Sequence, residues 1–159
     1  MSKVLIVAEH LGGKLNGSTA KCVSAAQALK PEAIDIVVLA DAPDAVAAEA
    51  AQIAGVARVL TVASAANAHA LAQVWAPQVQ AVASGYTHVF GPSTTFGKDL
   101  MPCIAALLGT TQVSDVMTVE GTHTFKRPIY AGNAIATVQS LDAVKVITVR
   151  TTGFDPSRR

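Results

Sequence analysis

Runs of apolar, β-branched residues alternate with segments of helical periodicity through the first two thirds of the chain. The apolar runs predict strands covered on both faces, at residues 4–8, 34–39, 58–62 and 88–90, with a fifth beginning at Val113. The segments between them predict helices, from Ser18 or Thr19 as N-cap to about residue 29, then at 43–54, 69–84 and 96–108. Strands that alternate with helices of this length predict a parallel sheet with right-handed crossovers.

The period changes after Val116. Short segments separated by turn residues predict further strands at residues 118–120, 124–127, 134–140 and 144–150. The expected fold class is therefore α/β: a doubly wound, mostly parallel sheet with antiparallel strands appended. We expect residues 1–153 to form this one domain. Residues 154–159 show no periodicity, and we expect them to be a linker or tail.

Composition narrows the class of protein. The chain has 159 residues, of which 51% are apolar and 14% charged, and its net charge is +1. A low content of charged residues is typical of a protein whose surface is partly covered by a lasting protein partner. A generally alanine-rich composition explains the low charge content equally well. Without a basic stripe, nucleic acid is not an expected partner. The apolar runs are too short for a signal peptide or a membrane span, so we expect no direct membrane insertion and a cytoplasmic location.

Reactive side chains form no recognisable catalytic or metal-binding set. Cys22 and Cys103 lie in helical patterns without C-x-x-C spacing, and we expect two buried, reduced thiols. The four histidines are scattered, so no metal is expected: His10, His69, His88 and His123. Ser114 and Asp115 end a predicted strand, where capping is favoured over ligand binding. We expect no enzyme activity.

Two loops are candidate anion cradles. The first contains Gly91, Ser93, Thr94 and Gly97, between a predicted strand and a helix N-terminus, where backbone amides and the helix dipole favour negative charge. Its glycines lack P-loop spacing, and a tight turn with a self-capped helix is the favoured alternative. The second loop, residues 12–19, lacks the dinucleotide fingerprint. A flexible loop before a capped helix explains it as well.

A third candidate is a protein interface. It comprises Arg127, Tyr130, Gly132 and Asn133. Arginine and tyrosine dominate the energetics of interfaces, and Gly132-Asn133 can turn the chain with positive φ. The alternative is a hairpin bend whose aromatic side chain packs on the sheet.

Several segments together resemble one known family. They are residues 93–99 with Pro102, Ser114-Asp115, Arg127 with the Tyr-Ala-Gly-Asn run at 130–133, and residues 148–150 with Phe154. In order and spacing they resemble the N-terminal domain of the electron transfer flavoprotein alpha subunit, and the resemblance covers nearly the whole chain. It implies a nucleotide-binding-like fold of the adenine nucleotide alpha hydrolase type. It also favours the interface interpretation of the segment from Arg127.

The resemblance implies a scaffold rather than a cofactor site. In that family the domain docks on a beta subunit, and the whole heterodimer carries electrons from flavin dehydrogenases to an acceptor. FAD lies in a second domain that follows at about the position of Arg159, so we expect none in this chain. Cys103 stands where the family commonly has arginine, which puts that arginine's contacts in doubt here. The rival hypothesis is a free-standing domain that binds AMP or ATP through the two glycine loops.

Overall fold

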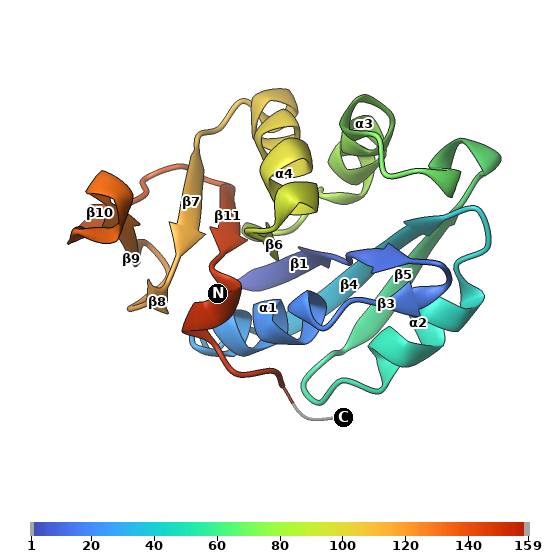
Figure 1. Cartoon of the computed structure of the whole chain (residues 1–159), viewed down its shortest axis with the longest axis horizontal. Helices are drawn as coiled ribbons and strands as arrows, with labels where there is room; N and C mark the ends of the chain where they lie inside the picture. The colour runs from blue at the N-terminus through green and yellow to red at the C-terminus, as the bar shows by residue number, and fades with distance from the viewer. Residues whose placement is uncertain (1, 158–159) are drawn as a thin grey trace.

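A six-stranded parallel sheet forms the middle of three layers (Figure 1). The computed structural model describes residues 2–157, without the side chain of Tyr130. Across the sheet the strands are β5 (Arg58–Ala63), β4 (Ala33–Ala40), β1 (Lys3–Val7), β6 (His88–Pro92), β11 (Lys145–Val149) and β7 (Gln112–Val116). The strand order runs outward on both sides of β1, so the expected doubly wound parallel sheet is confirmed.

Four helices cover the sheet. α1 (Ser18–Gln27) and α2 (Asp44–Ala51) lie on one face, and α3 (Ala72–Val82) and α4 (Thr95–Leu108) lie on the other (Figure 1). The strands are apolar on both faces for this reason. In β1, for example, Val4 and Ile6 belong to the core under α1, whereas Leu5 and Val7 belong to the core under α3 and α4.

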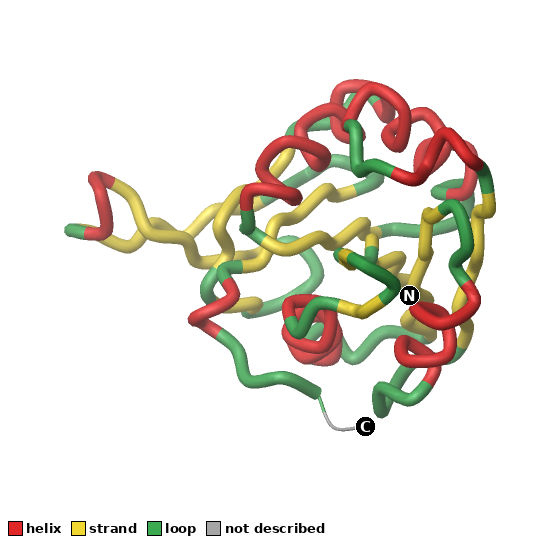
Figure 2. Tube along the Cα trace, turned by 45° about the vertical axis from the view of Figure 1, so that its right-hand side comes forward, coloured by secondary structure: helices red, strands yellow, loops and turns green. Residues whose placement is uncertain are grey.

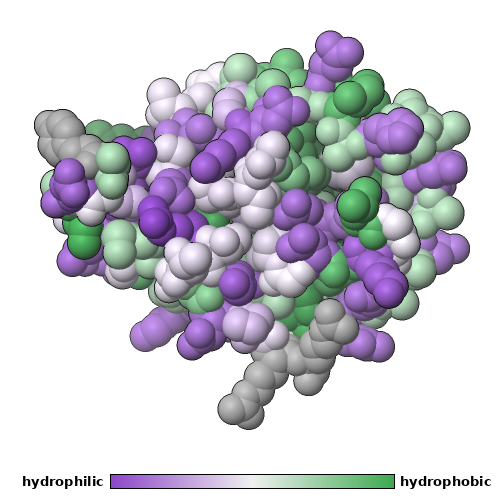
Figure 3. Space-filling view, in the orientation of Figure 1, coloured by the Kyte–Doolittle hydropathy of each residue, from purple (hydrophilic) through white to green (hydrophobic). Residues whose placement is uncertain are grey.

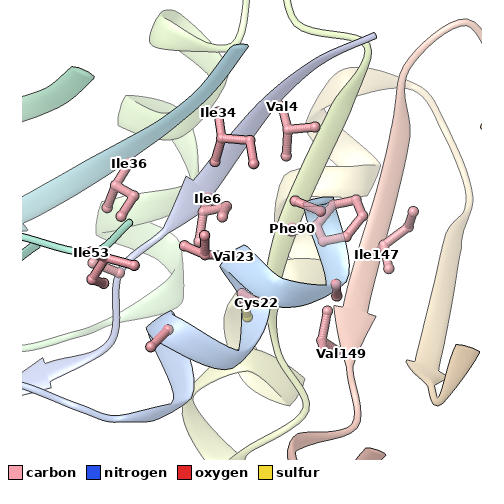
Figure 4. Close-up of a cluster of buried hydrophobic side chains, with 14 of the residues drawn as sticks. Val4, Ile6, Cys22, Val23, Ile34, Ile36, Ile53, Phe90, Ile147 and Val149 are labelled. Atoms are coloured by element: carbon pink, nitrogen blue, oxygen red, sulfur yellow. The ribbon is translucent and has the colours of Figure 1, made fainter. Parts of the chain in front are cut away.

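The core under α1 also contains a cysteine. Figure 4 shows Cys22 and Val23 of α1 in one cluster with Ile6, Phe90 and Ile147. Burial raises the pKa of the Cys22 thiol, and a nearby carboxylate raises it further, so this thiol stays protonated. Both cysteines are free thiols, as expected, but Cys103 is only half-buried.

The last strand corrects one expectation. Residues 144–150 were expected among the appended antiparallel strands, but β11 lies inside the main sheet, parallel to both β6 and β7. All five of its residues are buried. A strand without an exposed face or edge needs a neighbour on each side, and only the interior of the parallel sheet offers that.

The appended strands form two small antiparallel sheets. β8 (Thr118–Val119), β9 (Thr124–Ile129) and β10 (Ala134–Gln139) make the larger one, and Figure 2 shows the β9–β10 hairpin projecting from the body of the molecule. A short 3-10 turn, η2 (Tyr130–Gly132), closes the hairpin at its tip.

The smaller sheet was not predicted. It consists of β2 (His10–Leu11) and β3 (Lys14–Leu15) and occupies part of the second glycine loop. Gly12 and Gly13 have φ of 61° and 76°, the backbone of a two-residue hairpin turn that favours glycine. The loop is therefore largely a hairpin rather than a flexible segment.

Several helix boundaries differ from expectation. A 3-10 turn, η1 (Ala65–Ala68), occupies the connection before α3, so that helix begins later than expected. α2 ends at Ala51 instead of 54. Neither Ser18 nor Thr19 is the N-cap of α1, because Gly17 has that position and Asn16 Oδ1 accepts the Ser18 N–H at 2.9 Å. A last 3-10 turn, η3 (Thr151–Gly153), follows β11.

Among the described residues, no helix has the length and apolarity to cross a membrane.

Candidate functional site

The carboxyl ends of β1 and β6 meet where the strand order reverses, which is the usual ligand position in an open α/β sheet. The Glu9 side chain occupies this place. Its Oε1 accepts hydrogen bonds from Ser18 Oγ at 2.9 Å and from Thr94 Oγ1 at 3.1 Å. Ser18 begins α1 and Thr94 is the N-cap of α4. The two helix N-termini, which favour a bound anion, are thus both in contact with a carboxylate of the protein itself.

The loop with Gly91 and Gly97 is shaped by packing. A Cβ atom on Gly97 would overlap the Pro92 carbonyl oxygen, and one on Gly91 would collide with Met101 Sδ. Thr94 Oγ1 accepts the Gly97 N–H at 3.4 Å, so α4 is capped from within this loop. Gly97 is therefore required to seat α4 against the end of β6, whereas a side chain at Gly91 would displace the Met101 side chain.

The remaining cradle candidate in this loop is Ser93. Its backbone N–H donates to the Val149 carbonyl at 2.8 Å, which joins the loop to β11. Its Oγ atom is buried and has no hydrogen-bond partner among the described residues. The structure thus places all four cradle candidates in the loop between β6 and α4, and Thr94 among them contacts the Glu9 carboxylate. A ligand role for them remains a prediction.

Sequence reasoning missed Glu9. The available signal was a lone acidic residue directly after the first buried strand, ahead of two predicted helix N-termini. The glycine loop that follows it holds this arrangement, because Asn16 N donates to the Glu9 carbonyl at 2.8 Å and Glu9 N donates to Thr19 Oγ1 at 3.3 Å.

The interface candidates lie at the middle and at the tip of the projecting hairpin. Midway along β9, opposite Ala136, Arg127 donates from Nε to the Ser114 carbonyl at 2.8 Å and from a terminal nitrogen to Ser114 Oγ at 3.3 Å. At its tip, Gly132 has φ of 88° and Asn133 is exposed. The Tyr130 side chain lies outside the described residues. Arg127 thus holds the hairpin to β7.

Near its tip the hairpin exposes one large apolar side chain. Ile135 on β10 is 59% exposed although it is a large β-branched residue in a regular strand. Within residues 2–157, the Arg127 guanidinium has no carboxylate oxygen within 4.0 Å. Arginine is enriched at protein interfaces, whereas a single exposed apolar side chain is common on any protein surface.

Ser114 and Asp115 have a structural role different from the expected capping. Asp115 has φ of 57°, at a bulge where the pairing of β7 with β11 changes register. Its carboxylate lies 3.0 Å from an Arg150 nitrogen, and its backbone N–H donates to Thr148 Oγ1 at 2.7 Å. These contacts hold the bulge in place.

A second acidic residue is buried near the amino end of β4. Asp35 is completely buried, and its Oδ2 accepts from Tyr86 OH at 2.5 Å and from Arg58 at 3.0 Å. Burial, and then the contact with Asp35, raise the pKa of the Tyr86 hydroxyl.

In the described part of the chain, no three metal-binding side chains lie together. Figure 3 shows hydrophobic and hydrophilic residues interspersed over the face turned to the viewer.

Comparison with known proteins adds the family. Residues 4–159 match the family model of the electron transfer flavoprotein domain. The chain is 49% identical over 152 residues to the electron transfer flavoprotein subunit alpha of Pseudomonas aeruginosa and 46% identical over 153 residues to that of Paracoccus denitrificans. It is 40% identical over 161 residues to the mitochondrial subunit alpha of Dictyostelium discoideum. These alignments cover 96–97% of this chain but 45–49% of the relatives, so the chain spans about half their length.

Proposed function

Because the chain belongs to the electron transfer flavoprotein domain family and is similar to its alpha subunits, we propose that it is the N-terminal scaffold domain of such a subunit. In this role residues 1–153 dock on a beta subunit in the cytoplasm, and residues 154–159 lead toward the part of the protein that holds FAD. The complete heterodimer carries electrons from flavin dehydrogenases to an acceptor, and this domain itself catalyses no reaction.

The position of the Glu9 side chain is the observation that favours a scaffold domain over a nucleotide-binding domain. A nucleotide bound at the switch point would bring its phosphates to the N-termini of α1 and α4. The Glu9 carboxylate already receives hydrogen bonds from Ser18 and Thr94 there. An incoming phosphate would meet a like charge and would find both hydroxyls engaged, which disfavours AMP or ATP.

The same carboxylate disfavours FAD at this position. The pyrophosphate of FAD needs helix N-termini and close backbone approach, and a carboxylate beside it opposes binding. We therefore assign no FAD contact to the switch point of this domain. FAD would be held by residues outside it, and this domain would contribute a rigid surface.

The β9–β10 hairpin is the proposed docking element. It projects from the body, its tip contains Gly132 and Asn133, and Ile135 exposes apolar surface along it. Arg127 ties the middle of β9 to β7 through its two hydrogen bonds to Ser114. A hairpin held at its middle loses little conformational freedom on binding, which favours a stable complex.

Co-purification with an electron transfer flavoprotein beta subunit tests this proposal. The variant Ile135→Asp places a charge in the proposed interface, and we expect it to abolish co-purification. Leu11→Asp is the matched control, because Leu11 is 88% exposed on the β2–β3 hairpin at the other side of the molecule (Figure 1). We expect that variant to bind the beta subunit like the wild type. Equal binding by both variants would contradict the docking element, and failure of the wild type to bind would contradict the scaffold function.

A further inference from the structure

A pocket lies at the amino ends of the parallel strands, the end of the sheet opposite to Glu9. Its volume is about 330 Å³, at the lower end of the range for small-molecule sites. It lies at the amino ends of β6 and β11, where His88 and Lys145 are direct partners in the parallel pairing. The polar residues that line it include Ser2, His88, Thr122, His123, Asp142 and Lys145.

Lys145 is a buried cation without a close counter-ion. It is 4% exposed, and its Nζ donates to the Asp142 backbone carbonyl at 2.6 Å. No carboxylate oxygen of the described residues lies within 4.0 Å of this Nζ. An ammonium group taken out of water is costly unless a charge of opposite sign compensates it. The pocket beside Lys145 is the place where such a charge can bind.

The acidic side chain that lines the pocket, Asp142, already accepts hydrogen bonds from Thr111. Asp142 Oδ2 accepts from Thr111 N at 3.2 Å and from Thr111 Oγ1 at 2.8 Å. Hydrogen bonds from Thr110 and Thr111 lower the pKa of Asp142, so its carboxylate is charged and already has donors. It neutralises Lys145 only at longer range.

The other polar groups supply donors rather than negative charge. His88 is 1% exposed, its Nε2 donates to the Thr122 carbonyl at 2.9 Å, and its Nδ1 lies 2.8 Å from Thr87 Oγ1. Burial lowers the pKa of His88, so this ring is neutral and structural. His123 is exposed at the rim of the pocket. Ser2 and Thr122 add hydroxyl groups.

We propose that this pocket binds a phosphate-type oxyanion, either free or carried as a phosphate monoester, with Lys145 as its counter-ion. The ammonium supplies the charge at the floor of the pocket, and His123 and the hydroxyl groups supply hydrogen-bond donors around it. This site is independent of the docking hairpin, and it lies at the amino ends of the parallel strands, whereas Glu9 lies at their carboxyl ends.

Titration of the purified chain with inorganic phosphate and with glycerol phosphate, in a zwitterionic buffer, tests the proposal by calorimetry and by thermal unfolding. We expect saturable binding, and a rise in Tm of about 3–6 °C at ten times the Kd. Tighter binding of glycerol phosphate identifies a monoester as the ligand class, and equal binding identifies the free ion. Saturation with neither ligand would overturn the proposal.

Three variants separate a binding site from a merely structural lysine. Lys145→Met removes the uncompensated charge, so we expect it to lose the phosphate effect while unfolding at the same or a higher temperature than the phosphate-free wild type. Asp142→Asn removes the competing carboxylate, and we expect tighter phosphate binding. Lys98→Met is the matched control, since Lys98 is exposed on the first turns of α4, and we expect it to respond to phosphate like the wild type.

The opposite pattern would show that Asp142 is the permanent counter-ion of Lys145. In that case Lys145→Met and Asp142→Asn would both lower Tm without phosphate, and neither would change any response to it. Loss of the phosphate response in Lys98→Met would show a nonspecific effect of charge. Either result would overturn the proposal.

Discussion

Replacement of Glu9 tests whether a carboxylate of the protein acts as the internal anion of the switch point. Glu9→Ala removes the acceptor of two hydrogen bonds, from Ser18 Oγ at 2.9 Å and Thr94 Oγ1 at 3.1 Å. Glu9→Gln keeps an oxygen acceptor of the same shape but removes the charge. Comparison of the two variants therefore separates the hydrogen bonds from the attraction between the carboxylate and the two helix N-termini.

The expected magnitude follows from these contacts. Hydrogen bonds to a charged group contribute about 1.5–3 kcal/mol each, and a charge at a helix N-terminus contributes about 0.3–1 kcal/mol. Because Glu9 is half-buried, solvent screening places it at the lower end of these ranges. We expect Glu9→Ala to lower the free energy of unfolding by about 3 kcal/mol and Glu9→Gln by about 1 kcal/mol.

Urea denaturation followed by circular dichroism measures both values. Glu32→Ala is the control, because Glu32 is exposed, and we expect it to stay within about 0.5 kcal/mol of the wild type. If Glu9→Ala were as stable as the wild type, the carboxylate would not be a stabilising anion at this place. Equal losses in both Glu9 variants would show that the charge, and not the two hydrogen bonds, dominates.

Two further predictions concern packing and pH. We expect Gly97→Ala to lower Tm strongly or to prevent folding, because its Cβ would overlap the Pro92 carbonyl oxygen. A variant that unfolds at the same temperature as the wild type would refute this close approach. For His88, burial lowers the pKa below its usual value of 6.5 in the folded state, so the unfolded chain takes up a proton first as pH falls. The free energy of unfolding should therefore decline as the pH falls from about 8 to about 5. The urea midpoint of His88→Gln should decline less over this interval. If the midpoint of the variant declined as much as that of the wild type, groups other than His88 would be responsible.

The three-layer fold is predictable from the sequence because its strands are buried on both faces. The run at Val4–Ala8 and the alternation of strands with helices indicate a parallel sheet without knowledge of the partners. The place of β11 is not predictable in the same way. Its apolar residues show that it is interior, but the pattern does not contain the order of the strands, and three antiparallel strands precede it in the chain.

The candidate sites depend on contacts between distant segments. Glu9, Ser18 and Thr94 meet only because β1 and β6 are neighbours. Lys145 and His88 become partners only once β11 is placed beside β6. In the loop with Gly91 and Gly97, by contrast, the local pattern was informative: it indicated a turn and a self-capped helix, and the structure has Thr94 as the cap of α4.

Hydrogen–deuterium exchange of the chain with and without a beta subunit tests the central claim most directly. The scaffold account expects added protection of backbone amides in the β9–β10 hairpin, residues 124–139, and unchanged exchange in the β2–β3 hairpin, residues 10–15. Protection confined to the β2–β3 hairpin, or no change in exchange at any amide, would contradict it.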